Sequence, residues 1–260
     1  MERVRVERTD RTAVITIDNR NRANAFDREM TVELGNRLAE IEADATIRCA
    51  VLTGAGDRAF SSGHDLSELR QSVVLDPEVE GVFRRPQQMS TPVVAAVNGA
   101  AYAAGLMLVL SAPIRIASKG ASFCASGARV GLPPVGGQLS DLVRLISPAV
   151  ATEMLVTARP ISAARAYEIG LVSHLTDRTG LMPLAMELAG VIAANSPSVV
   201  GVILEGLRVQ RDHGSAEAES FERAVMAELA GSRDAAEGVA AFLERRAPEF
   251  EDRPRIGGYG

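Results

Sequence analysis

Hydrophobic and polar residues follow two different periods in the first fifty positions. Residues 4–8 and 12–17 are rich in β-branched side chains and are separated by three polar residues, which predicts a β-hairpin. A polar loop then leads to residues 27–43, where apolar residues recur with a helical period and Asp27 is a suitable N-cap. The start of the chain therefore predicts a β-β-α unit. The apolar face of its helix carries Met30, Leu34, Leu38 and Ile41.

Three later segments are short and mostly apolar. They cover residues 49–52, 93–97 and 114–117, and each is separated from the next by a helical or turn segment. The first two are uninterrupted apolar runs, which are typical of strands that are buried on both faces. Strands that alternate with helices predict an α/β layered fold with mostly parallel strands.

Strand signals nearly vanish from Ser162 onward. The last predicted helix, residues 234–246, carries Val239, Phe242 and Leu243 on one face. A tail of this length has little core of its own, so we expect it to pack on the main domain or on another subunit. We therefore predict a core of residues 1–195 and a helical region of residues 196–260 that forms a homo-oligomer. The predicted helices are residues 181–194, 198–211, 217–230 and 234–246.

Composition narrows the class of protein. The chain has 260 residues, 47% of them hydrophobic, which is enough to bury a sizeable core. A net charge of −5 gives no basic footprint for nucleic acid. Two cysteines without CxxC spacing and three scattered histidines predict neither a disulfide framework nor a metal site. We expect a cytoplasmic protein with no membrane span, no cleaved leader and no nucleic-acid partner.

Two glycine-punctuated turns, at residues 60–66 and 98–105, carry the candidate chemistry. Each follows a strand-like run and leads into a segment that can be helical. The first amides of a helix have no intrahelical partner and carry the positive end of its dipole. Two such turns can aim two backbone N–H groups at one point, which is the geometry of an oxyanion hole.

Two other interpretations of this region fail. Residues 54–59 match the dinucleotide pattern G-x-G-x-x-A, but a helix should open within the glycines, and the Phe-Ser-Ser-Gly that follows predicts a turn instead. Ser61, Ser62, His64 and Asp65 include the residue types of a hydrolytic triad. Neighbours in sequence cannot form its relay, and the chain has no G-x-S-x-G elbow.

Taken together, the motifs resemble the crotonase family, also called the enoyl-CoA hydratase/isomerase family. The resemblance covers almost the whole chain, and the motifs keep a shared order and spacing. They are VITI at 14–17, NAF at 24–26, VLTGAG at 51–56, AFSSGHDL at 59–66, PVVAAVNG at 92–99, VGLP at 130–133, EML at 153–155, ISA at 161–163, GLVS at 170–173 and GVAAFLERR at 238–246.

The resemblance implies a crotonase-like spiral of β-β-α units with a C-terminal helical oligomerisation region. It also implies an acyl-CoA thioester as ligand, coenzyme A as part of the substrate with no permanent cofactor, and a homotrimer or dimer of trimers. The backbone N–H groups that match the oxyanion hole are those of His64 and Ala104.

The resemblance places further residues around the ligand. Phe242 and Arg245 match tail residues that reach the CoA of the same or a neighbouring subunit, and Arg22, Arg58 and Arg245 are the cations expected near its phosphates. The positions matched to the pantetheine, adenine and thioester are Asn24, Ala25, Phe26, Ser61, Ser62, Gly63, Asp65 and Gly105.

The chain departs from the family at the two catalytic glutamates. Hydration across a double bond uses one carboxylate for water and one for the α-proton. Aligned on the motifs, the first position falls on Met107 and the second on Gly127 or an immediate neighbour. The usual two-glutamate hydration is therefore not expected.

Three hypotheses stay open. The chain is an acyl-CoA enzyme with a base from elsewhere, a catalytically silent acyl-CoA carrier or sensor, or an oligomeric interaction scaffold that no longer binds CoA. The side chain of His64 either points away while its amide works, or acts as a base near the thioester. The candidate bases are His64, Asp76, Glu78, Glu80 and Asp141.

Overall fold

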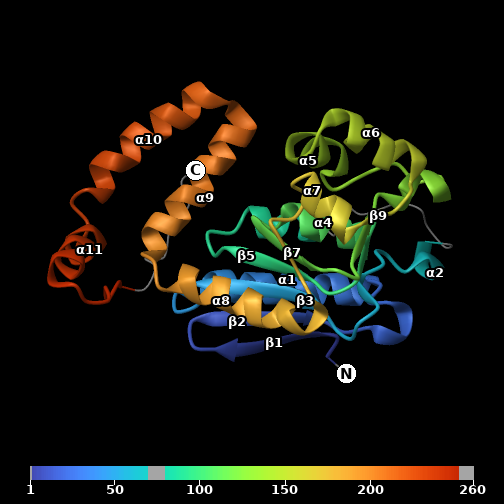
Figure 1. The fold of residues 1–260 in the computed structure, drawn as a ribbon, viewed down its shortest axis with the longest axis horizontal. Coiled ribbons are helices and arrows are strands. Elements are labelled where there is room, and N and C mark those ends of the chain that lie inside the picture. Colours follow the sequence, from blue (N-terminus) through green and yellow to red (C-terminus); the bar gives the residue numbers. More distant parts are fainter. Residues whose placement is uncertain (1, 70–79, 252–260) are drawn as a thin grey trace.

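The structure, a computed structural model, describes residues 2–69 and 80–251, and within these residues the strands form two sheets (Figure 1). The larger sheet has six strands in the order β1-β2-β3-β5-β7-β10, and the smaller has four in the order β4-β6-β8-β9. The strands are β1 Val4–Thr9, β2 Thr12–Ile17, β3 Cys49–Gly54, β4 Ala59–Ser61, β5 Val93–Val97, β6 Ala100–Tyr102, β7 Ile114–Ser118, β8 Ser122–Cys124, β9 Ile161–Ser162 and β10 His174–Thr176.

Successive strands from β3 to β8 alternate between the two sheets. β3 leads to β4, β5 to β6 and β7 to β8, and the first strand of each pair lies in the larger sheet and the second in the smaller. Strands of successive pairs run parallel in both sheets. Among the described strands, antiparallel pairing is confined to β1 with β2 and β8 with β9. The predicted spiral and the predicted excess of parallel strands are therefore confirmed.

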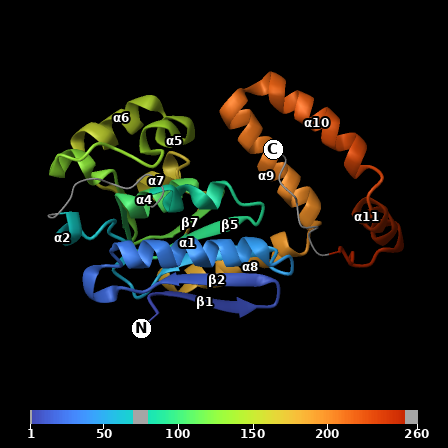
Figure 2. The same cartoon turned by 180° about the vertical axis from the view of Figure 1, so that it is seen from behind.

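Helices bury the larger sheet on both faces. Ala50 and Leu52 of β3 point into the main core with helix α1 (Arg28–Ala43), whereas Cys49 and Val51 point to the opposite face with α8 (Leu181–Ala193). Figure 2 shows α1 in front of the sheet and α8 behind it. Burial on both sides explains why the apolar run of β3 carries no alternation. The predicted apolar face of α1 is buried, and Asp27 accepts a hydrogen bond from the Met30 N–H at 2.9 Å as its N-cap.

The smaller sheet is the part of the fold that the hydrophobic pattern did not indicate. We expected each glycine turn to connect a strand directly to a helix, but β4 and β6 overlap these segments. Each has three residues, and its partners come from distant parts of the chain. Three residues are too few to display a strand period, so this sheet depends on tertiary pairing.

The remaining helices cover the end of the spiral and form the tail. The short helix α2 (Leu66–Leu69) follows the first glycine turn, and the 3-10 segment η2 (Val82–Gln87) precedes β5. The predicted tail helices are confirmed, with ends that differ by at most two residues. The other helices are α4 Ala104–Ser111, α5 Gln138–Leu145, α6 Pro148–Thr157, α7 Ala163–Glu168, α9 Pro197–His213, α10 Ser215–Leu229 and α11 Arg233–Glu244, with 3-10 turns at Arg20–Arg22, Ser126–Val130 and Arg178–Gly180.

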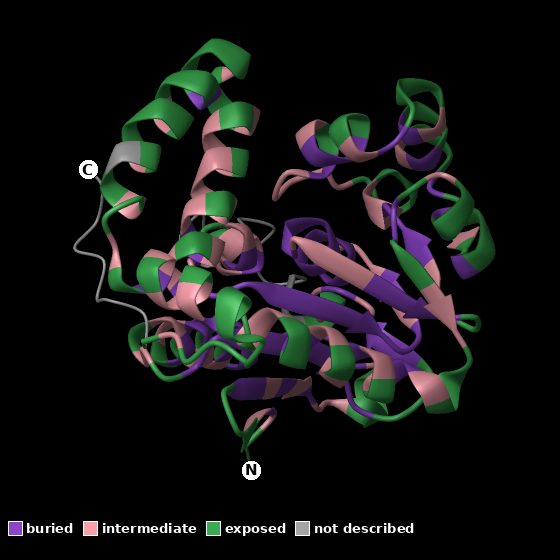
Figure 3. Cartoon of the chain, turned by 60° about the vertical axis from the view of Figure 1, so that its left-hand side comes forward, coloured by how far each residue is buried: buried purple, intermediate pink, exposed green. Residues whose placement is uncertain are grey.

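The tail helices α9 to α11 project from the core, and many of their residues are exposed (Figure 3). Phe242 is 82% exposed, and Leu243, Val239 and Met226 are more than half exposed. No single helix among the described residues is long and apolar enough to cross a membrane. The segments Arg178–Ala193 and Pro197–His213 have the required length and composition only when taken together, and the chain bends by 105° between them. The division at residue 195 and the homo-oligomer stay predictions.

Candidate active site

The two glycine turns lie against each other. Gly63 has a φ of 100°, and a Cβ on it would lie 2.7 Å from the Cβ of Ala103 and 3.2 Å from the backbone nitrogen of Ala104. A Cβ on Gly105 would lie 2.3 Å from the carbonyl oxygen of Ser61. Only glycine permits approaches this close. The parallel pairing of β4 with β6 brings the two turns together.

The backbone around His64 sets the direction of its N–H. Phe26 donates its N–H to the carbonyl of Gly63 at 2.8 Å, and Asp65 donates its N–H to the carbonyl of Phe26 at 2.7 Å. Successive N–H groups of an extended chain alternate in direction, so the N–H of His64 points away from Phe26. Ala104 is the first residue of α4, and the N–H of such a residue has no intrahelical partner.

A cavity of about 470 Å³ opens at this junction. All four positions predicted for the oxyanion hole and the absent glutamates, His64, Ala104, Met107 and Gly127, line it. Ala25, Ser62 and Asp65 line it as well. Arg22, which was expected near the phosphates, also lines the cavity. The sequence did not indicate the other residues of the wall as site residues, because most of them follow Gly127 in a segment without a regular hydrophobic period. They are Leu66, Ala103, Ser126, Val130, Leu132, Pro133, Val135 and Gln138.

Several predicted residues support the cavity from behind. Asn24 is buried, and its side-chain amide donates to the carbonyls of Ala55 and Ala59 at 3.0 and 2.8 Å. The hydroxyl of Ser61 accepts the N–H of Gly63 at 3.1 Å. These side chains hold the shape of the two turns. Phe26, Gly63 and Gly105 likewise do not line the cavity but belong to the segments that form it.

Phe242 and Arg245 lie at the far end of the molecule from this cavity. They belong to or follow α11, which lies at one end of the longest axis in Figures 1 and 2, whereas α2, whose Leu66 lines the cavity, lies at the other. Within one chain, the structure does not bring them to the site. Their role at the ligand therefore stays a prediction that requires a neighbouring subunit.

An apolar side chain occupies the position that the sequence motifs match to the first glutamate. Met107 is 1% exposed, and its Cε reaches Gly136, where an added Cβ would lie 1.6 Å away. At the second position, a Cβ on Gly127 would lie 2.7 Å from the carbonyl oxygen of Leu132. Leu132 donates its N–H to the carbonyl of Gly127 at 3.0 Å, which closes this turn.

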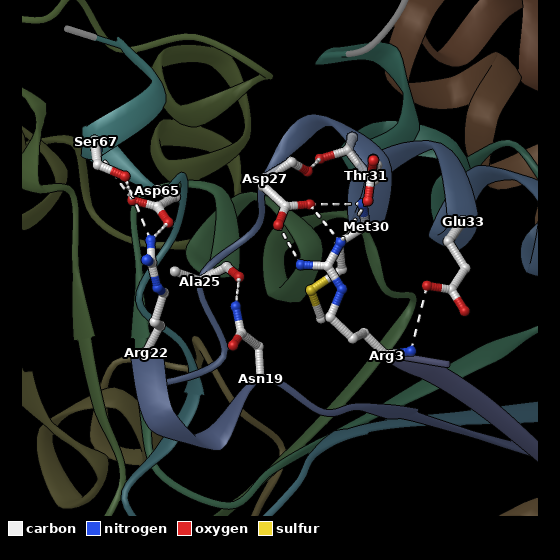
Figure 4. A network of polar contacts seen from close by, with 11 residues as sticks. Arg3, Asn19, Arg22, Ala25, Asp27, Met30, Thr31, Glu33, Asp65 and Ser67 are labelled. Atoms are coloured by element: carbon white, nitrogen blue, oxygen red, sulfur yellow. Dashed lines mark hydrogen bonds and ion pairs between the residues drawn. The ribbon is translucent and has the colours of Figure 1, made fainter. Parts of the chain in front are cut away.

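Asp65 is the only carboxylate among the described residues that line the cavity. Figure 4 shows its side chain held between Ser67 and Arg22. The hydroxyl and N–H of Ser67, together with the Arg22 guanidinium, hold the pKa of the Asp65 carboxyl below its usual range. A carboxylate that stays ionised and paired is a weak general base.

The other candidate bases have different surroundings. Nε2 of His64 lies 3.0 Å from Oε1 of Glu80. Asp141 lines a separate cavity between α4, α5 and α9, beside Arg84 and Arg144. Asp76 and Glu78 lie outside the described residues. Of the two acidic candidates within the described residues, Glu80 is the one that lies next to the site.

Ala103 has a backbone conformation that glycine adopts more readily. Its φ of 47° and ψ of −116° cost an L-residue about 1–3 kcal/mol. We expect Ala103→Gly to raise the free energy of unfolding by about 1 kcal/mol, because relief of this strain exceeds the added entropy of the unfolded chain. Urea denaturation at fixed protein concentration measures the change. Ala100→Gly, at a position in β6 without positive φ, is the control and should lower stability by about 0.5–1 kcal/mol. Equal losses in both variants would contradict the expectation.

No group of three His, Cys, Asp or Glu side chains in the described part of the chain is arranged to hold a metal ion. The cavity is lined by His64 and Ala104, by the ion pair of Asp65 with Arg22, and by an apolar wall that includes Met107. Positions 107 and 127 carry no carboxylate.

Residues 7–253 match the enoyl-CoA hydratase/isomerase family. The chain is 34% identical over 256 residues to the enoyl-CoA hydratase EchA19 of Mycobacterium tuberculosis, covering 95% of this chain and 96% of that one. It is 33% identical to a carnitinyl-CoA dehydratase of Proteus mirabilis, covering 94% and 97% of the two chains. An enoyl-CoA hydratase structure from Bacillus anthracis superposes with a TM-score of 0.90 at 30% identity, covering 97% of this chain and 100% of that one.

The fold and the turns thus define a crotonase-type protein. The chain belongs to the enoyl-CoA hydratase/isomerase family, as the sequence motifs indicated.

Proposed function

We propose that this protein binds an acyl-CoA thioester and polarises its carbonyl oxygen between the N–H groups of His64 and Ala104. The observation that supports the proposal is the contact between the two turns, with Ala104 at the start of α4 and the N–H of His64 directed away from Phe26. Negative charge that develops on the thioester oxygen would meet two donors that are already oriented. The reaction class is lyase or isomerase chemistry through an enolate.

The absence of both usual glutamates separates this protein from a two-carboxylate hydratase. An enolate needs a base at the α-carbon, but it does not need an activated water. Met107 places a thioether where a water-activating carboxylate is expected, so we propose that ordinary hydration is slow or absent. The same observation favours a second candidate, a silent acyl-CoA carrier or sensor.

We further propose that α9 to α11 assemble the protein as a homotrimer or a dimer of trimers. The exposed side chains of Val239, Phe242 and Leu243 would be buried against another copy. Such an assembly would allow Phe242 and Arg245 to reach the CoA of a neighbouring subunit.

Calorimetry with butyryl-CoA tests the proposal, with free coenzyme A as the matched control. We expect saturable binding of the thioester and weaker binding of the free coenzyme, because the latter lacks the carbonyl and the acyl chain. With crotonyl-CoA, the absorbance of the conjugated enoyl thioester should fall slowly or not at all. If butyryl-CoA does not bind, the proposal is contradicted, and the interaction scaffold is the hypothesis that remains. Rapid loss of the enoyl absorbance would contradict the proposal that hydration is slow or absent.

A further inference from the structure

We propose that His64 is the base that takes the α-proton of the bound thioester, and that Glu80 positions its imidazole ring. The proposal deepens the function proposed above and rests on it, since it requires the thioester in the cavity. The sequence contains five candidate bases for this step. The contacts of the His64 ring distinguish one of them.

The first observation is the contact between two side chains that are sixteen residues apart. Nε2 of His64 lies 3.0 Å from Oε1 of Glu80, and the two side chains are only 18% and 12% exposed. Nε2 of His64 and Oε2 of Glu80 are enclosed, and neither makes a hydrogen bond with the described residues. The approach of Nε2 to Oε1 is thus short but off the line of a hydrogen bond, and catalytic hydrogen bonds are often poorly aligned before the substrate binds.

A second contact holds the same ring from another direction. The ring of Phe83 in η2 meets His64 edge to face, with centroids 5.1 Å apart and an interplanar angle of 88°. Phe83 is fully buried and packs in turn on Phe26 at 5.1 Å. The imidazole therefore has a fixed orientation, which a side chain free in solvent would not have.

Alignment of the contact between Nε2 and Glu80 when the substrate binds would select one form of the imidazole. A carboxylate hydrogen-bonded to Nε2 favours the tautomer with its proton on that nitrogen, which leaves the lone pair on Nδ1. His64 lines the cavity, and its own N–H is one of the two proposed donors to the thioester oxygen. The α-carbon is one bond from the thioester carbon. A base on residue 64 is therefore close to the proton that it must take.

Transfer of the α-proton to His64 requires no cofactor. Nδ1 of His64 takes the α-proton, the electron pair of the broken C–H bond forms the carbon–carbon double bond of the enolate, and the thioester oxygen gains the negative charge. The two N–H groups stabilise that oxygen, and Glu80 stabilises the imidazolium. Return of a proton from the imidazolium to carbon completes exchange at the α-carbon, or isomerisation when an unsaturated chain accepts the proton elsewhere.

Exchange of the α-protons of butyryl-CoA in D₂O, followed by proton NMR, tests the assignment. We expect the wild type to exchange them and His64→Ala to lower the rate constant at saturation by about 100-fold. Glu80→Gln should lower it about tenfold. The calorimetric Kd should stay within about twofold in both variants. His174→Ala, which removes an exposed histidine on β10, is the control and should leave the rate unchanged.

Added imidazole should restore part of the exchange in His64→Ala, an effect that loss of a merely structural side chain would not show. Butyryl-CoA binding with no exchange in the wild type, or with wild-type exchange in His64→Ala, would overturn the assignment while leaving the proposed binding function intact. Wild-type exchange in Glu80→Gln would overturn the role of Glu80. No binding of butyryl-CoA would reject the proposed function itself, and the base assignment with it.

Discussion

Ala104→Pro should lower the rate of α-proton exchange by about 10²–10³-fold, because proline has no N–H to donate to the thioester oxygen. Loss of one oxyanion donor typically costs about 2.7–4 kcal/mol of transition-state stabilisation. The N–H of Ala104 has no intrahelical partner, since this residue begins α4. Proline is well tolerated at the first position of a helix. The loss should therefore appear in the reaction and not in the helix.

Ala104→Gly is the matched control, because it also changes the side chain but keeps the N–H. Its exchange rate should stay within a few-fold of the wild type. Proline also restricts the residue before it, and Ala103 already has a positive φ. Circular dichroism and thermal melting must therefore show that Ala104→Pro is folded. A folded Ala104→Pro protein with the wild-type exchange rate would reject the oxyanion hole.

Met107→Glu should raise the rate of crotonyl-CoA hydration by about 10²–10⁴-fold over the wild type, the usual range for one general acid or base. Methionine and glutamate side chains have similar lengths, so the carboxyl would occupy the place of the thioether next to Gly136. The burial of Met107 also favours a carboxyl whose pKa is raised toward neutrality, which suits a general base. Loss of the enoyl absorbance at 25 °C measures the rate.

Met107→Gln is the control, since it has nearly the same shape but cannot take a proton. Its hydration rate should stay at the wild-type level. Equal rates in folded Met107→Glu and Met107→Gln variants would show that position 107 does not face the β-carbon of the acyl chain. Adding Gly127→Glu would be less informative, because the new side chain would force the carbonyl of Leu132 to move from the 2.7 Å position.

Local pattern predicted the elements whose period extends over many residues. The face of α1 could be read from Met30, Leu34 and Leu38, and its N-cap from Asp27, because helix formation and capping depend on residues within one or two turns. The buried strands β3 and β5 could be read from uninterrupted apolar runs, and β7 from a run that Arg115 interrupts. The short strands β4, β6 and β8 could not, since three residues become a strand only beside their partners.

The sequence by itself determined the family, the spiral of β-β-α units and the absence of glutamates at positions 107 and 127, because these depend on residue identity and on order along the chain. Only the tertiary structure decided which charged groups share the cavity. Asp141 lines a different cavity, Asp65 is held by Ser67 and Arg22, and Glu80 meets His64 from another element. The physical reason is that contacts between side chains distant in sequence depend on how the sheets and helices pack, and no local period records that packing.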